Sequence, residues 1–348
     1  MNVVAVTGVG GGVGQSILKS LAGSQYVVIG MDSDFLAAGL YTTSKSFLIP
    51  DAESIDYISR LLEICKDEKV SLLFPGLDAE LMVLAKNRER FKAIGTTVIV
   101  SEERVIEISN DKMETYNSLK ALGVNVPSTW PLDEFTKKDC VFPLIIKQRV
   151  GGARSKNVFL AHNEHDFDVA LSQIRVDRSN IIVQEYIEGE EYTCGTVNLE
   201  GLCKAVIIMR RLLRDGDTYK CFTENNSVIE DTVMKTVASI KPFGACNVQL
   251  RMKNGVPWIF EINARCSGTT ASRTLCGFNE PRLIADFLLR GIEPSVEVQE
   301  KTILRYWDEI VVENSLVEKL RSSKMISKKS KPVAEFSCNG LQPIKGDK

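Results

Sequence analysis

The chain has 348 residues, which is long enough for two or three domains that share a sizeable core. It is 44% hydrophobic and 25% charged, and its formal net charge of -2 gives no basic excess that would favour a nucleic-acid or membrane-surface partner. Nine scattered cysteines, none of them spaced CxxC, argue against a disulfide framework or a zinc site. Glycines interrupt the first apolar stretch, so neither a signal peptide nor a membrane span is expected, and the default location is cytoplasmic.

The first hundred residues alternate between short apolar strands and amphipathic helices. A β-branched run at residues 2–7 predicts a strand, followed by the glycine-rich turn VTGVGGGVG and a helix over residues 15–24. Further strands are expected at 26–32, 70–78 and 96–101, and further helices at 55–70 and 79–91. Alternation of this kind predicts a parallel, doubly wound α/β sheet.

The alternation ends near residue 101, where two consecutive helices are expected. Strands at 142–149 and 156–163 then flank the glycine-bearing segment GGARS. From residue 181 the strands are long and of antiparallel type, up to a helical section at about 271–290. The lysine-rich tail from about residue 314 is predicted to be solvated or partly disordered. The second half therefore reads as α+β.

The glycine turn also fits the TGxxGxxG spacing of a short-chain dehydrogenase, and Asp32 follows near the distance expected for a ribose-binding acid. Such an enzyme needs a Tyr-x-x-x-Lys pair, which Tyr116 and Lys120 supply. That pair comes before the sheet has enough strands, and the acidic segments of the second half are left unexplained. An NAD-dependent oxidoreductase is therefore a minor alternative. A tight turn, or an anion site at the helix N-terminus, accounts for the glycines as well.

The strongest chemical signal lies in VPWIFEINARCSG. Strand alternation places Glu261 and Asn263 on one face, with Arg265 next in line. The pair Asn-Gly at 254–255 predicts a hairpin turn, which brings Gln249 beside Glu261. Carboxylate and amide oxygens on one face suit a hard cation such as Mg²⁺, and the arginine suits a transferring phosphoryl group. The alternative is a solvent-facing hairpin with incidental polar residues.

Two lysines suit the phosphate side of such a site: Lys112 in SNDKMET and Lys147 in FPLIIKQR. Lys147 ends an apolar strand just before the glycine-bearing segment, which could close over phosphates. Each lysine taken singly is more often simply exposed. The segment IIVQEYIEGEEYT leads from an apolar strand into acids that could contact an adenine edge and ribose hydroxyls.

Taken together in this order, these residues resemble the ATP-grasp superfamily. The resemblance runs from NDK through LIIK, the glycine-bearing segment and QEYIEGEEYT to EINAR, and covers residues 1 to about 290. VTGVGGGVGQSILKSL and EINARCSG look most like the carbamoyl-phosphate synthase large-subunit branch and its small stand-alone relatives. The fold it implies is a Rossmann-like pre-ATP-grasp domain followed by a two-subdomain ATP-grasp fold. The implied boundaries are 1–105 for the first domain, 106–180 for the small subdomain, 181–312 for the large subdomain and 313–348 for a basic tail.

The resemblance also implies roles for single residues. Lys112 and Lys147 would contact the phosphates of ATP, and Lys147 would take part in catalysis. Glu185, together with the backbone around Tyr186 and Ile187, would hold the adenine ring.

The remaining implied roles concern the ribose, the metal and the transferred group. Glu191 would bind the ribose. Gln249, Glu261 and Asn263 would bind one or two Mg²⁺ ions, with Mn²⁺ as an alternative, and Arg265 would stabilise the transferring phosphoryl group. Three more arginines are candidates for phosphate or substrate-carboxylate contacts, with simple exposure expected equally: Arg210, Arg211 and Arg214.

The implied activity is that of a carboxylate-amine ligase, in which ATP converts a carboxylate to an acylphosphate that an amine or ammonia then attacks. One ATP-grasp half and no obvious glutamine-hydrolysing segment argue against authentic carbamoyl phosphate synthesis. The alternatives are a catalytically silent nucleotide-binding or regulatory subunit and, less favoured, the oxidoreductase. Small carboxylate and amine molecules are the expected partners, no nucleic acid or membrane is expected, and a homodimer fits the resemblance.

Overall fold

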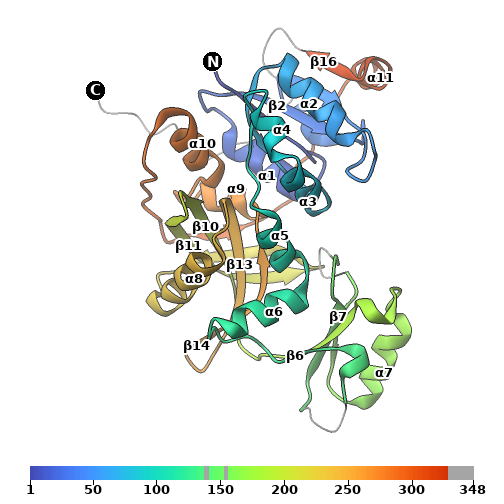
Figure 1. The fold of residues 1–348 in the computed structure, drawn as a ribbon, viewed down its shortest axis with the longest axis vertical. Helices are drawn as coiled ribbons and strands as arrows, with labels where there is room; N and C mark the ends of the chain where they lie inside the picture. Colours follow the sequence, from blue (N-terminus) through green and yellow to red (C-terminus); the bar gives the residue numbers. More distant parts are fainter. Residues whose placement is uncertain (137–140, 153–155, 328–348) are drawn as a thin grey trace.

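The computed structural model describes residues 1–136, 141–152 and 156–327. Within these ranges the strands form three sheets, two of six strands and one of four. Figure 1 shows the N-terminal sheet with its helices at the top, a second sheet in the centre, and the four-stranded sheet in a small lobe at the lower right. No helix in these ranges has the length and apolar character that a bilayer span requires.

The N-terminal sheet has the parallel, doubly wound arrangement that the sequence predicts. Its parallel strands are β1 (Val3–Val6), β2 (Val27–Asp32), β3 (Lys45–Leu48), β4 (Val70–Phe74) and β5 (Thr97–Val98). The helices between them are α1 (Gly12–Leu21), η1 (Ala38–Tyr41), α2 (Tyr57–Asp67), α3 (Asp78–Lys86) and α4 (Arg88–Lys92). Three successive residues of β1 are buried, because a central parallel strand is covered on both faces.

Two elements of this sheet were not expected from the sequence. One is β3, and the other is the strand β16 (Met325–Ser327), which follows helix α11 (Asn314–Ser323) and pairs antiparallel with β3. The prediction of a solvated tail is therefore wrong for residues 314–327. Leu320 and Ile326 are fully buried, so this lysine-rich stretch has enough apolar residues to close one edge of the sheet. Residues 328–348 lie outside the described part of the chain.

The small lobe is an antiparallel sheet covered by one helix. Its strands, in the order β6-β9-β7-β8, are β6 (Thr129–Pro131), β7 (Leu144–Gln148), β8 (Val158–Ala161) and β9 (Ile181–Glu185). Helix α7 (Glu164–Gln173) and the turns η2 (Leu132–Glu134) and η4 (Arg178–Asn180) complete it. The boundary expected after residue 180 would cut off β9, which pairs with both β6 and β7, so the lobe extends to residue 185.

The central sheet is antiparallel and contains the predicted hairpin. Its order is β14-β13-β10-β11-β12-β15, with β10 (Glu190–Leu199), β11 (Leu202–Arg214), β12 (Asp217–Thr223), β13 (Gly244–Lys253), β14 (Val256–Asn263) and β15 (Thr302–Leu304). Asn254 and Gly255, with φ of 52 and 77°, form the turn between β13 and β14, as their positive φ preference predicts. Helices α8 (Ser227–Ile240), α9 (Thr270–Thr274) and α10 (Glu280–Arg290) follow β12 and β14 in the chain.

Two helices that were expected to belong to the small subdomain pack outside the small lobe instead. These are α5 (Glu103–Asn110) and α6 (Lys112–Ala121). Leu119 and Val124 lie in one buried cluster with Val248 and Ile262 of β13 and β14. Helix α6 and the segment up to Val124 therefore belong with the central sheet, because their apolar residues are buried there. Helix α5 instead buries Val105 and Ile106 in the cluster of the N-terminal sheet.

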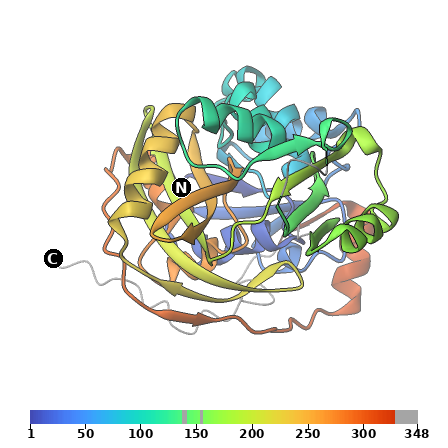
Figure 2. The ribbon, with the colours of Figure 1, turned by 90° about the horizontal axis from the view of Figure 1, so that it is seen from below.

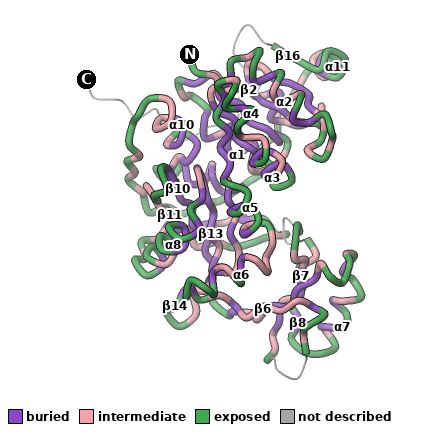
Figure 3. Tube along the Cα trace, viewed as in Figure 1, coloured by how far each residue is buried: buried purple, intermediate pink, exposed green. Residues whose placement is uncertain are grey.

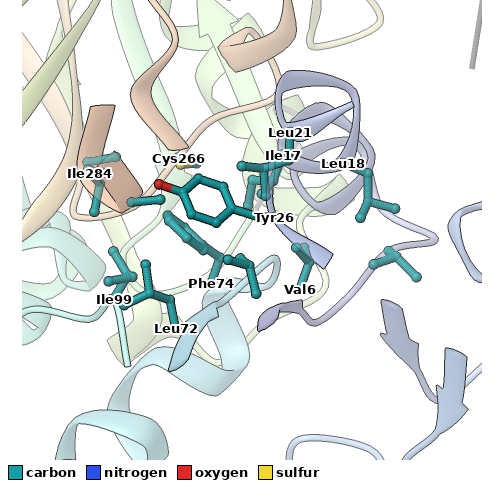
Figure 4. Packing of buried hydrophobic residues seen from close by; sticks show 14 of the residues in the cluster. Val6, Ile17, Leu18, Leu21, Tyr26, Leu72, Phe74, Ile99, Cys266 and Ile284 are labelled. Atoms are coloured by element: carbon teal, nitrogen blue, oxygen red, sulfur yellow. The ribbon is translucent and has the colours of Figure 1, made fainter. Parts of the chain in front are cut away.

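The N-terminal and central parts share one hydrophobic core. Figure 4 shows Val6 and Phe74 of the first sheet packed in one cluster with Cys266 and Ile284, which come from beyond β14. In Figure 3 the buried residues form a continuous region from the upper part of the molecule into the centre. Figure 2 shows the chain after α10 running along the outside of the molecule back to α11. The small lobe, in contrast, has a core of its own around Ile146.

Candidate functional site

One face of the central sheet carries a block of polar residues in register across three strands. The pairing places Glu191 opposite Arg251, Thr193 opposite Gln249, and Gln249 opposite Glu261. Because side chains alternate between the two faces of a strand, these odd-numbered residues of β10 and β13 share a face. A regular two-residue turn at 254–255 would place Gln249 opposite Phe260. The register of the two strands shifts by one residue between Gln249 and Leu250, and this irregularity brings Gln249 opposite Glu261.

The candidate metal ligands are in direct contact. Asn263 Nδ2 donates a hydrogen bond of 3.0 Å to Glu261 Oε1, and Gln249 Nε2 donates one of 3.5 Å to the same oxygen. Within the described ranges no group of three or more His, Cys, Asp or Glu side chains could hold a metal ion. One carboxylate with two amide oxygens is nevertheless a donor set that Mg²⁺ accepts when nucleotide phosphates supply further oxygens. The residues present therefore fit a phosphate-bound Mg²⁺ ion.

Arg265 forms an ion pair with a carboxylate at the start of helix α3 in the N-terminal part of the chain. Its Nε and NH2 groups donate to the two carboxylate oxygens of Asp78, both at 2.6 Å. Its NH1 group donates to the Cys266 carbonyl at 2.9 Å, and NH2 also reaches Asn263 Oδ1 at 3.4 Å. Asp78 is the first residue of α3 and was missed in the sequence. The one feature of the sequence that could have indicated a role for Asp78 is its position after the PGL turn that follows a strand.

Lys147 projects from the small lobe toward the central sheet. The ammonium lies 5.8 Å from the ring centre of Phe260 on β14 and donates a hydrogen bond of 2.8 Å to Gln184 Oε1. Its side chain is buried, which lowers its pKa to about 8, while the charge of Glu261 acts in the opposite direction and that of Lys112 adds to the lowering. Lys112 and Glu261 are thus both close enough to Lys147 to influence the pKa of its ammonium group.

Lys112 lies at the start of α6 and holds the backbone that follows β7. Its Nζ donates to the Gly151 carbonyl at 2.9 Å and reaches the Arg149 carbonyl at 3.4 Å. Arg149 in turn pairs with Asp111 at 2.8 Å, and Asp111 also caps α6. Lys112 is therefore positioned beside the start of the glycine-bearing segment, of which residues 153–155 lie outside the described part of the chain.

The segment that joins the small lobe to β10 holds the candidate adenine contacts. Glu185 Oε2 accepts a hydrogen bond of 3.3 Å from the Ser128 backbone N–H, and Ile187 is buried. Arg251 reaches this segment from β13. Its NH1 donates to the Tyr186 hydroxyl at 3.0 Å and to the Ile187 carbonyl at 3.5 Å, and its guanidinium lies over the Tyr186 ring.

Glu191, the candidate ribose ligand, lies between two arginines. Arg211 NH2 pairs with Glu191 Oε1 at 2.6 Å, and Arg251 NH2 pairs with Glu191 Oε2 at 2.7 Å. Arg211 NH2 also donates to Gln249 Oε1 at 2.7 Å. The candidate ribose and metal residues are therefore connected through Arg211.

The glycine turn of the N-terminal sheet is filled by the chain's own backbone. A Cβ atom at Gly14 would overlap the Gly8 carbonyl oxygen, so α1 can approach the turn only without a side chain there. The Asp32 carboxylate accepts hydrogen bonds from the backbone N–H groups of Gly10 at 2.7 Å and Asp34 at 3.0 Å. These contacts account for the glycines and for Asp32 as parts of a tight turn, without an NAD molecule.

The sequence and the fold were compared with known proteins. A family model described as an ATP-grasp domain matches residues 109–269. Residues 109–269 are an ATP-grasp domain. A second family model, the PylC-like N-terminal domain, matches residues 5–99, so the ATP-grasp domain follows a PylC-like domain.

The similar proteins are ligases and synthases. The chain is 24% identical to the carbamoyl phosphate synthase large chain of Thermoanaerobacter pseudethanolicus over 71% of its own length and 24% of that protein, so it spans about a quarter of this relative. It is 23% identical to D-alanine–D-alanine ligase A of Bacillus cereus, over 68% of this chain and 88% of that protein. The structure of N5-carboxyaminoimidazole synthetase from Staphylococcus aureus, complexed with ADP, has a TM-score of 0.65 at 15% identity, covering 93% of this chain and 96% of that chain.

A fully buried ion pair lies on the same face of the central sheet as the polar block of the ATP-grasp domain, and contacts it at Thr193. Arg273 of α9 pairs with Glu280 of α10 at 2.5 Å, and its NH2 group donates to Thr193 Oγ1 at 3.2 Å and to Asn247 Oδ1. Asn247 lies opposite Asn263 in the sheet, so the pair fixes the end of the strand that carries the candidate metal ligands. The sequence did not single out either charged residue.

Proposed function

We propose that this chain is an ATP-dependent ligase that converts a substrate carboxylate to an acylphosphate and joins it to an amine or ammonia. The main support for this proposal is that a lysine of the small lobe lies close to oxygen-donor side chains of the central sheet. Lys147 of the small lobe lies over Phe260, one residue before Glu261. An ammonium group facing a carboxylate and two amides is the arrangement that binds a phosphate chain together with a divalent cation.

The reaction proceeds in two steps. A carboxylate oxygen of the substrate bonds to the γ-phosphorus of ATP, and the bond from that phosphorus to the β,γ-bridging oxygen breaks, which releases ADP. The amine nitrogen then attacks the acyl carbon, phosphate leaves with the electron pair of the C–O bond, and the nitrogen gives its proton to solvent or phosphate. When bound, Mg²⁺ neutralises charge on the phosphates.

This chain's own residues supply position and charge. Lys112 and Lys147 hold the phosphates, and Gln249, Glu261 and Asn263 hold the metal. Arg265 stabilises the phosphoryl group in transfer, and no nucleophilic side chain is required. The adenine and ribose are assigned to the segment from Glu185 to Ile187 and to Glu191.

Support for the ligase reaction comes from the nature of the similar proteins. The relatives include a D-alanine–D-alanine ligase and a carbamoyl phosphate synthase large chain, and solved structures of similar fold include an L-amino acid ligase from Bacillus licheniformis. These names support an acid and an amine as the substrate classes of this chain. A homodimer and a cytoplasmic location stay predictions, as does the argument against authentic carbamoyl phosphate synthesis.

The test is ADP release from Mg·ATP in the presence of pooled amino acids, small carboxylic acids and bicarbonate, each with and without ammonia or an amine donor. We expect ADP to appear with one pool, and splitting that pool identifies the acid. Thermal unfolding gives the control, because a ligand at about 100 times its Kd adds roughly 2.7 kcal/mol to the free energy of unfolding. Stabilisation by NAD(H) but not by Mg·ATP would contradict the proposal. ATP binding without ADP release from any pool would favour a catalytically silent nucleotide-binding protein.

A further inference from the structure

Arg211 is bound to both ends of the proposed nucleotide site. Its Nε and NH2 groups donate to Glu191 Oε1 at 2.9 and 2.6 Å, and NH2 also donates to Gln249 Oε1 at 2.7 Å. Glu191 is the residue proposed for the ribose, and Gln249 is one of those proposed for the metal. In this arrangement a guanidinium group occupies the oxygen that the metal would use.

The neighbouring arginines of β11 are directed elsewhere. Arg210 lies over the Phe222 ring and pairs with Glu224 at 2.6 Å, since strand alternation sends it to the opposite face. Arg214, at the end of the strand, is exposed and lies over the Tyr219 ring. Of the three arginines that the sequence singled out, only Arg211 touches the polar face of the ATP-grasp domain.

The same residue lines an open cavity. This cavity has a volume of about 480 Å³ and is bordered by Glu191, Arg211 and Arg251, together with residues 189, 190, 210, 212 and 213. The lining includes three guanidinium groups (Arg210, Arg211 and Arg251) and two carboxylates (Glu190 and Glu191), a mixture that suits a ligand carrying both anionic groups and hydroxyls. A pocket of this size is within the range of small-molecule and cofactor sites.

The contact between Arg211 and Gln249 cannot persist beside a bound metal ion. A divalent cation on Gln249 Oε1 would lie within a few ångströms of the guanidinium, and like charges at that distance repel strongly in a partly buried site. Arg211 is not the sole partner of Glu191, because Arg251 pairs with the second carboxylate oxygen of Glu191. Repulsion from the cation would therefore move Arg211 away from Gln249. Glu191 would still be paired with Arg251 after this movement.

We propose that Arg211 is a phosphate-binding residue of this site, held between Glu191 and Gln249 until Mg·ATP displaces it onto the phosphate chain. The inference rests on the proposed function, because it requires that the site binds a nucleotide. It narrows the expectation for the three arginines of β11 to Arg211 alone, and to the phosphates rather than a substrate carboxylate.

The experiment compares the affinities of the full chain for adenosine and for ATP, both with Mg²⁺, by isothermal titration calorimetry. The variants are Arg211→Ala and Arg211→Lys, with Arg214→Ala as the matched control on the same strand. Loss of a charge-assisted phosphate contact is expected to weaken ATP binding by about tenfold or more in Arg211→Ala, and less in Arg211→Lys. Adenosine binding is expected to stay within about twofold of wild type, as is all binding by Arg214→Ala.

The outcomes separate this inference from the proposed function. Unchanged ATP affinity in Arg211→Ala would overturn it. Equal losses for adenosine and ATP would also overturn it, because Arg211 would then act by positioning Glu191. A wild-type chain that binds no Mg·ATP would overturn the proposed function itself and this inference with it. Circular dichroism of each variant checks the fold, which is expected to be retained because Arg251 still pairs with Glu191.

Discussion

Asp78 and Arg265 form a two-point ion pair between the PylC-like N-terminal domain and the ATP-grasp domain. The two contacts, Nε to Oδ1 and NH2 to Oδ2, both measure 2.6 Å. Parallel N–H···O contacts of this kind fix the plane of the guanidinium as well as its position. The arginine proposed to stabilise the transferred phosphoryl group is thus oriented by a residue that lies almost two hundred positions earlier in the chain.

Asp78→Asn is expected to lower the turnover number for ADP release by about tenfold or more, because a misplaced arginine stabilises the transition state poorly. The Michaelis constant for ATP should change little, since the lysine and metal contacts remain. The stability cost is expected to be about 1 kcal/mol, because Asp78 is 43% exposed. Steady-state kinetics and thermal unfolding measure the two effects. Glu63→Gln, in the exposed ion pair with Arg60, is the control, and equal turnover in both variants would contradict the positioning role.

The buried ammonium of Lys147 predicts a pH dependence of ATP binding. Burial lowers its pKa from the ordinary value of 10.5 to about 8, so the folded protein loses this proton at a lower pH than the unfolded chain. The affinity of the protein for ATP should fall as the pH rises through about 8, because Lys147 then loses the proton that gives it the positive charge for binding phosphate. Titrations between about pH 6.5 and 9.5 measure this, and Lys147→Met should bind weakly with no inflection near 8.

The same pKa predicts the sign of a stability effect. Between about pH 8 and 10.5 the unfolded chain binds more protons at this residue than the folded chain, so the contribution of Lys147 to the free energy of unfolding rises with pH in that window. Below pH 8 both states are protonated and the folded state bears the desolvation cost of the charge. The test is the difference in free energy of unfolding between wild type and Lys147→Met. If this difference stays constant between about pH 8 and 10.5, the pKa of Lys147 is not lowered.

Glu261→Ala is expected to abolish Mg²⁺-dependent ADP formation and leave the fold intact. Glu261 is the only carboxylate in the proposed metal set, so its loss leaves two amides that cannot balance a divalent charge. Stabilisation by Mg·ATP, roughly 2.7 kcal/mol at 100 times the wild-type Kd, should largely disappear. Differential scanning calorimetry and the ADP assay measure the two effects, with Glu230→Ala on the exposed face of α8 as the control. Near-normal turnover would remove Glu261 from the site.

Ile326→Ala tests the role of the C-terminal strand in the first sheet. Ile326 is 1% exposed in β16, whereas its neighbour Met325 is 38% exposed. Truncating the buried side chain should lower the free energy of unfolding by about 2–5 kcal/mol. Met325→Ala, on the opposite face of the same strand, should cost much less. Denaturant unfolding measures both, and equal small losses would show that β16 adds little to the sheet.

Much of the architecture followed from local pattern. Alternating strands and helices predicted the parallel sheet of the N-terminal domain, since hydrophobic periodicity reports directly which face of an element is buried. The turn at residues 254–255 also predicted the hairpin, but its regular register would place Gln249 opposite Phe260. A one-residue shift between Gln249 and Leu250 is what pairs Gln249 with Glu261. The hairpin, the alternation that puts Glu261 and Asn263 on one face, and the order of the ATP-grasp segments were thus readable from the sequence, whereas the pairing of Gln249 with Glu261 was not.

Contacts between distant segments were not readable. The sequence alone gave no reason to pair Asp78 with Arg265, or to place a lysine-rich stretch at the edge of the first sheet as β16. The first contact depends on the shared core, which joins Cys266 to residues of the N-terminal sheet. The second depends on the burial of Leu320 and Ile326 in that same core. Arg211 shows the same limit, because alternation says only that it faces away from Arg210. That it lies between Glu191 and Gln249 was decided by the packing of three strands, β10, β11 and β13, a nonlocal arrangement that no short stretch of sequence encodes.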